Sequence, residues 1–153
     1  MVKIFFLAAS LLLAVNTVSL ASENNIYEVS PYKITPVKSV SNIKNAVWAD
    51  NISSYETPKM CADFVLTKNN VREFFRLAKQ VSEREYGHDL LMSRCSAEGE
   101  IVFANGDKGK WDIDRTRRGL LILSDGRFAY FYCTKCRPKV FVEPCNEKCL
   151  NGE

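Results

Sequence analysis

Six cysteines are the feature of this chain of 153 residues that most limits what it can fold into. Four of them stand between Tyr132 and Cys149, in the spacing C-x2-C-x8-C-x3-C, while Cys61 and Cys95 lie apart from this cluster. Clustered cysteines can bind a metal ion, carry out a redox reaction or form structural disulfides, and the compartment of the protein favours one of these roles over the others.

The first 21 residues have the pattern of a secretory signal peptide. Lys3 is followed by an apolar block from Ile4 to Leu13, and Ala21 is the small residue expected directly before a cleavage site. Asn16 and Thr17 interrupt the apolar run before it reaches the ~20 residues that a membrane-spanning helix needs. We therefore expect an exported protein, periplasmic or extracellular, with no membrane span after cleavage.

In an oxidising compartment, the favoured role of the six cysteines is to form disulfides. A zinc ribbon usually has a longer gap between its two cysteine pairs, so no metal is expected. A redox-active C-x-x-C motif usually precedes a helix, whereas Cys133 and Cys136 follow an apolar run and lead into Pro138. Thiol-disulfide oxidoreductase activity at this pair is therefore the weaker alternative, and no cofactor is expected.

The expected disulfide pairing follows from the order of the predicted elements. We expect Cys61 to pair with Cys95, which would join the entry of a helix to the first strand. A nested arrangement would then join Cys133 to Cys149 and Cys136 to Cys145. The alternative is that Cys95 pairs with the last strand and leaves Cys61 for the tail.

The composition divides the rest of the chain into an arm and a domain. Residues 22–60 contain prolines, serines and asparagines without a sustained period of 2 or 3.6, which is typical of an extended or irregular arm. Residues 61–153 are predicted to form one α+β domain with a cysteine-rich C-terminal tail. Within it, Thr67 is the expected N-cap of an amphipathic helix that ends at Gly87.

Five short apolar runs after this helix predict an antiparallel meander of about five strands. Glycine-containing turn signals at Gly99, Asn105-Gly106, Arg118-Gly119 and Asp125-Gly126 separate the runs. The predicted fold is the helix packed on this sheet. The expected strands are Leu90 to Cys95, Ile101 to Ala104, Lys110 to Arg115, Leu120 to Leu123 and Phe128 to Cys133.

The sequence contains few candidates for catalysis, and we expect the protein not to be an enzyme. His88 is the only histidine, and its position at the predicted helix end suits a structural role. Asp112 and Asp114 are expected on the wet face of a strand, where neighbouring arginines would pair with them in a surface cluster. A small secreted enzyme that uses His88 with a carboxylate is a further alternative.

The strongest surface signal is the segment from Lys108 to Lys139, which holds nine basic residues and three acidic ones and also several aromatic residues. Arginine and aromatic side chains are common in protein interfaces, so we expect an acidic protein as the partner. A net charge of +3 is too low to favour nucleic acid. The leading hypothesis is an exported binding protein, such as an inhibitor or immunity-type protein, and the other alternative is an envelope-associated structural module. The expected binding residues are Arg115, Arg117, Arg118, Arg127, Tyr130 and Tyr132.

Overall fold

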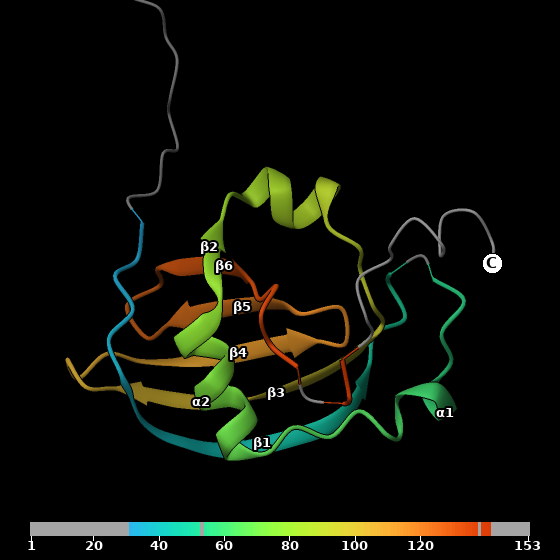
Figure 1. The fold of residues 1–153 in the computed structure, drawn as a ribbon, viewed down its shortest axis with the longest axis horizontal. Helices are drawn as coiled ribbons and strands as arrows, with labels where there is room; N and C mark the ends of the chain where they lie inside the picture. The colour runs from blue at the N-terminus through green and yellow to red at the C-terminus, as the bar shows by residue number, and fades with distance from the viewer. Residues whose placement is uncertain (1–30, 53, 138, 142–153) are drawn as a thin grey trace, which may run out of the picture. The chain divides into compact units, whose positions relative to one another are not determined.

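The structure is a computed structural model that describes residues 31–52, 54–137 and 139–141 (Figure 1). The predicted signal peptide, the start of the predicted arm, Cys145 and Cys149 lie outside these residues. The described chain is mainly a six-stranded antiparallel sheet with short helices, which agrees with the broad α+β class. The strands are β1 (Val37–Trp48), β2 (Lys79–Val81), β3 (Cys95–Phe103), β4 (Lys108–Asp114), β5 (Arg118–Leu123) and β6 (Phe128–Tyr132), and the helical segments are α1 (Pro58–Cys61), α2 (Lys68–Leu77) and the π-helix η1 (Glu85–Asp89).

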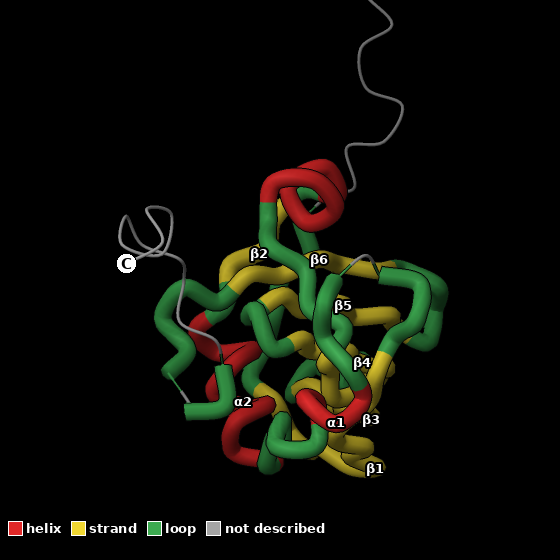
Figure 2. Tube along the Cα trace, turned by 90° about the vertical axis from the view of Figure 1, so that its right-hand side faces the viewer, coloured by secondary structure: helices red, strands yellow, loops and turns green. Residues whose placement is uncertain are grey.

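The strand order in the sheet is β1-β3-β4-β5-β6-β2. Strands β3 to β6 form a meander in which each strand pairs with the next one in the chain. The edge strands β1 and β2 come from the segments before and after α2, and Figure 2 shows them at opposite ends of the row of strands. The predicted turns at Gly106 and Gly126 are confirmed, since both glycines have positive φ angles.

Helix α2 covers one face of the sheet, and the hydrophobic core lies between them (Figure 1). The Thr67 side chain accepts a hydrogen bond from the Asn70 N–H at the start of the helix. Val71, Phe74 and Phe75 are its buried residues. A Cβ atom at position 119 would lie 2.6 Å from the ring of Phe74. Gly119 therefore allows the Phe74 ring to pack directly against the backbone of β5.

The prediction that this helix continues to Gly87 is wrong. The chain leaves the helix at Ala78, which is extended, and residues Lys79–Val81 pair with β6 as strand β2. Val81 lies opposite Tyr130 in this pairing, so its helical spacing with the preceding apolar residues does not place it in the core that α2 covers. Gly87 lies within η1 instead of ending α2.

The predicted irregular arm contains a long strand. Strand β1 pairs with β3 along its length, but its register shifts at three places. Asn42 and Ala46 have positive φ angles within the strand, and such bulges break the alternation of side chains that would have revealed it in the sequence. The arm is therefore part of the sheet from Val37 to Trp48, and its last residues form α1.

Two of the predicted strand boundaries are also wrong. Leu90 to Cys95 is not a strand, because β3 begins at Cys95 and runs through Gly99. Gly99 does not mark a turn. A Cβ atom at position 99 would lie only 2.8 Å from the indole ring of Trp111, so this position accepts only glycine unless the neighbouring atoms move.

Candidate functional site

The sheet face opposite α2 carries an open row of apolar, aromatic and basic side chains, which we call the outer face. Side chains alternate between the two faces of a strand, and the buried Trp111, Leu121 and Phe131 point toward the core. Lys110 lies opposite Ile122, and Ile122 lies opposite Phe128. We use the term outer face for the following residues of β4, β5 and β6: Lys108, Lys110, Leu120, Ile122, Phe128, Tyr130 and Tyr132. The same alternation places the acidic Asp112 on this side of the sheet, together with Glu98 and Glu100 of β3.

The apolar part of the outer face is accessible to solvent. Ile122 is 47% exposed and Phe128 is 41% exposed, although both lie within strands of the sheet. Phe128 packs edge to face with Tyr130, whose ring stacks on Tyr86 at 4.6 Å between centroids. A hollow of about 450 Å³ adjoins Ile122, and Val102 and Lys108 also line it. The outer face therefore has a concave region as well as exposed apolar side chains.

The basic part of the outer face consists of Lys108 and Lys110, both of which are exposed. Among the residues that the structure describes, neither lysine forms an ion pair. The nearby carboxylates have other partners, since Glu98 pairs with Lys44 and Glu100 accepts a hydrogen bond from Asn42. Within the described part of the chain, neither ammonium group is thus joined to a carboxylate by an ion pair, although Glu100 lies opposite Lys110 in the register.

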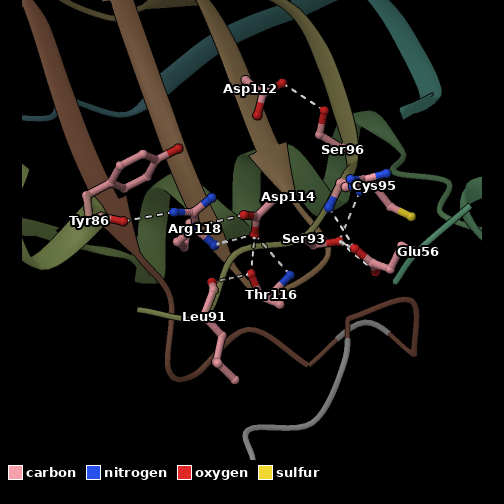
Figure 3. A network of polar contacts seen from close by, with 11 residues as sticks. Glu56, Tyr86, Leu91, Ser93, Cys95, Ser96, Asp112, Asp114, Thr116 and Arg118 are labelled. Carbon is pink, nitrogen blue, oxygen red and sulfur yellow. Dashed lines mark hydrogen bonds and ion pairs between the residues drawn. The ribbon is translucent and has the colours of Figure 1, made fainter. Parts of the chain in front are cut away.

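A buried ion pair supports one end of the outer face (Figure 3). Arg118 Nε lies 2.7 Å from Asp114 Oδ2, and both side chains are almost fully buried. The Asp114 carboxylate also accepts hydrogen bonds from Thr116, and Arg118 Nη1 donates to the carbonyl of Tyr86. Burial raises the pKa of Asp114, whereas the guanidinium of Arg118 opposes this shift.

These contacts hold the segment that carries η1 against the sheet. Arg118 lies 4.5 Å from the centroid of the Tyr86 ring, in addition to its bond to the Tyr86 carbonyl. Thr116 Oγ1 donates to the carbonyl of Leu91 at the other end of the segment. Burial raises the pKa of Tyr86. The Tyr86 ring is thereby fixed against Tyr130, which limits the conformations of the aromatic residues on the outer face.

Asp112 is a second carboxylate next to this network, and no ion pair joins it to an arginine among the described residues. Its Oδ2 accepts a hydrogen bond from Ser96 Oγ at 2.9 Å. Burial raises the pKa of Asp112 to about 6, and the nearby Asp114 and Glu98 contribute to this shift. The face of β4 that was predicted to be wet is therefore partly covered where it carries Asp112 and Asp114.

A third carboxylate, Glu56, connects two loops at the same end of the sheet (Figure 3). It accepts hydrogen bonds from Ser93 Oγ and from the Arg94 N–H. The adjacent disulfide between Cys61 and Cys95 joins the same parts of the chain, which confirms the predicted pairing of these two cysteines. The loops around Glu56 are thus fixed by covalent and polar contacts.

The nested disulfide pairing is wrong, because Cys133 pairs with Cys136. The turn directly after β6 brings their Cα atoms to 5.4 Å, which is within the range that a disulfide spans. Both residues are buried. Cys145 and Cys149, the other two cysteines of the predicted nested pairing, lie outside the described residues.

Three of the predicted binding arginines are engaged within the fold. Arg115 binds Asp63 and the carbonyl of Met60, and Arg118 is part of the buried pair. Arg117 is 2% exposed and lies over the ring of Phe141. The predicted turn at Arg118-Gly119 is wrong, because both residues lie in β5. Arg117 and Arg118, which were predicted to bind a partner, are buried, and the Asp114 carboxylate accepts a hydrogen bond from the Arg118 N–H across the turn before β5.

The other predicted binding residues lie nearer to solvent. Arg127 is exposed but forms ion pairs with Asp125 and Asp107. Tyr130 and Tyr132 are partly buried on the outer face. The prediction did not select Ile122 and Phe128, although the alternation of β5 and β6 places them beside the tyrosines.

Groups for catalysis or metal binding are scarce among the described residues. His88 lies exposed in η1. Among residues 31–52, 54–137 and 139–141, no three His, Cys, Asp or Glu side chains are placed to hold a metal ion. No helix in the same part of the chain is long and apolar enough to cross a membrane.

Comparisons with protein-family models, with curated proteins and with solved structures find no match for this chain. The functional argument therefore rests on the side chains of the outer face and on the contacts that support them.

Proposed function

We propose that this is a small exported, non-enzymatic protein that binds an acidic protein through its outer face and thereby inhibits it. The observation that supports the proposal is the position of Lys108 and Lys110, which form no ion pair with any described residue, beside the exposed side chains of Ile122 and Phe128. Aromatic and aliphatic anchors next to complementary charge are typical of the centre of a protein interface. The two disulfides are compatible with an oxidising compartment.

The apolar and the basic parts of this face would contribute differently to binding. Ile122 and Phe128 would lose their remaining contact with water, and anchors of this kind can each contribute ~2 kcal/mol or more. Lys108 and Lys110 would mainly accelerate association and select an acidic partner, because opposite charges attract each other during the encounter. Salt should reduce this effect, since exposed charges are screened beyond a Debye length of ~8 Å at physiological ionic strength. Binding should therefore combine a salt-sensitive association rate with a slower dissociation set by the apolar contacts.

A rigid sheet face suits an inhibitor because little conformational freedom is lost on binding. The stack of Tyr86 on Tyr130 and the buried pair beneath it hold one end of the face. The oxidoreductase alternative is weaker, since Cys133 and Cys136 are both buried and an exchange reaction needs an accessible sulfur.

The test is capture of a partner from extracts of the compartment into which the protein is exported. We expect Lys108→Glu with Lys110→Glu to weaken capture strongly, and high salt to weaken capture by the unmodified protein. The matched control is Lys59→Glu with Lys68→Glu, which reverses two exposed lysines on the helices α1 and α2. Equal capture by all three proteins at both salt concentrations would contradict the proposal.

A further inference from the structure

A groove on the α2 side of the sheet shares no residue with the outer face. It lies between the chain that leads into β1 and helix α2, and its volume is about 520 Å³. Pockets of roughly 300–1,000 Å³ are typical of sites for small molecules. Ile34, Val37, Phe75 and Ala78 supply apolar lining, and Arg72 and Arg76 stand beside them.

The two arginines are one helical turn apart and have only weak partners in the described chain. Arg76 lies 3.8 Å from Glu73, and both of these side chains are well exposed, so this ion pair contributes little. Arg72 Nη1 makes a hydrogen bond of 3.4 Å with the Asn69 side chain. Guanidinium groups bind carboxylates with two parallel hydrogen bonds, which makes this rim suitable for a carboxylate.

Three polar groups in the groove wall already have hydrogen-bond partners. The carbonyl of Pro36 accepts a hydrogen bond from the Ala104 N–H, and proline has no N–H to offer. The Ala78 N–H donates to the carbonyl of Phe74, and Thr35 Oγ1 accepts from the Asn105 N–H. A peptide would bring its own N–H and C=O groups into this largely apolar groove, where these three groups are not free to pair with them, and unpaired polar groups would cost affinity. An alkyl chain has no such groups.

We propose that this groove binds a free fatty acid, with the alkyl chain against Ile34, Val37 and Phe75 and the carboxylate between Arg72 and Arg76. The apolar lining removes the alkyl chain from water, which supplies most of the affinity. The guanidinium groups select an anionic head group and orient the molecule. The site is independent of the proposed interface, because none of its residues belongs to the outer face.

Titration calorimetry of the full chain with intact disulfides tests this site, using dodecanoate below its micelle concentration and dodecan-1-ol as the uncharged analogue. We expect one dodecanoate to bind per chain and dodecan-1-ol to bind about tenfold or more weakly, since hydrogen bonds to charged groups contribute ~1.5–3 kcal/mol. Amide NMR shifts should change at Val37 and Phe75. No saturable binding of dodecanoate, or equal binding of the two ligands, would overturn the proposal.

Variants distinguish the groove from unspecific binding. Arg72→Gln with Arg76→Gln should weaken dodecanoate binding about tenfold or more, for the same reason. Arg84→Gln is the matched control because Arg84 is exposed and lies outside the groove, and this variant should bind as the unmodified protein does. Circular dichroism verifies that each variant is folded. A short peptide with a free C-terminal carboxylate that bound more tightly than dodecanoate would also overturn the proposal.

Discussion

Arg118 and Asp114 form a buried ion pair across the turn between β4 and β5, with Nε 2.7 Å from Oδ2 and side chains only 5% and 4% exposed. The Asp114 carboxylate accepts hydrogen bonds from the backbone N–H groups of Thr116 and Arg118. The Arg118 guanidinium donates a hydrogen bond to the carbonyl of Tyr86. One pair thus closes a turn, and it also holds η1 beside β6. The aromatic residues of the outer face depend on this pair for their support.

Replacing Arg118 by Met should destabilise the protein strongly. The change leaves the Asp114 carboxylate buried without its cation, and breaking such a pair typically costs ~3–5 kcal/mol. Urea unfolding followed by circular dichroism measures the loss. Arg127→Met is the control, since its pair with Asp125 is exposed and screened by water and should contribute little to stability. Similar losses in the two variants would show that burial of the Asp114–Arg118 pair does not matter.

Asp112 should make the stability depend on pH in the weakly acidic range. The folded protein holds this proton more tightly than the unfolded chain, because the pKa of Asp112 rises from 3.8 to about 6 on folding. Stability from this group is therefore fully present below about pH 4 and falls as the pH rises to about 6. A shift of this size corresponds to ~3 kcal/mol.

Asp112→Asn should remove this dependence, because the amide oxygen can still accept the Ser96 hydrogen bond. The measurement is the free energy of unfolding as a function of pH between 3.5 and 7. This range covers the titration of Asp112 in both the unfolded and the folded protein, because a carboxyl group titrates over roughly one pH unit on either side of its pKa. The control is Asp125→Asn. Hydrogen bonds from Arg127 lower the pKa of Asp125. The stability that Asp125 contributes is therefore lost as the pH falls, which is opposite to the behaviour of Asp112. An unchanged pH profile in Asp112→Asn would contradict the assignment.

The two disulfides should differ in their contribution to stability. Cys61 and Cys95 are 34 residues apart, whereas Cys133 and Cys136 are three residues apart. In the loop-entropy account, removing the first bridge should cost ~4 kcal/mol and removing the second ~2 kcal/mol. Double Cys→Ala variants and urea unfolding measure both. Peptide mapping without reduction checks the pairing itself, and a Cys133 peptide linked to any cysteine other than Cys136 would refute it.

The sequence predicted the parts of the fold that depend on neighbouring residues. The turns at Gly106 and Gly126 are examples, because Asn-Gly and Asp-Gly pairs favour positive φ angles wherever they stand. The pairing of Cys61 with Cys95 also followed from the order of the elements. Strand β1 was missed since its bulges at Asn42 and Ala46 remove the period of 2 on which strand prediction relies.

The candidate site was only partly predictable, because burial is a property of the assembled fold. Arg118 and Arg127 look alike in the sequence, yet one is buried beside Asp114 and the other is exposed. No local pattern separates the two. Ile122 could have been found from the alternation of β5, in which Leu121 and Leu123 are the buried neighbours. The lack of an ion pair at Lys108 and Lys110 emerges only from the positions of all the described carboxylates.

The most direct test of the proposed interface is site-specific photo-crosslinking in the cells that make the protein. Ile122 and Val65 are both 47% exposed, but only Ile122 belongs to the outer face, so benzoylphenylalanine at each position gives a matched pair. We predict a single protein adduct from position 122 that disappears with Lys108→Glu and Lys110→Glu, and no such adduct from position 65. No adduct from position 122, or the same adduct from both positions, would contradict the account.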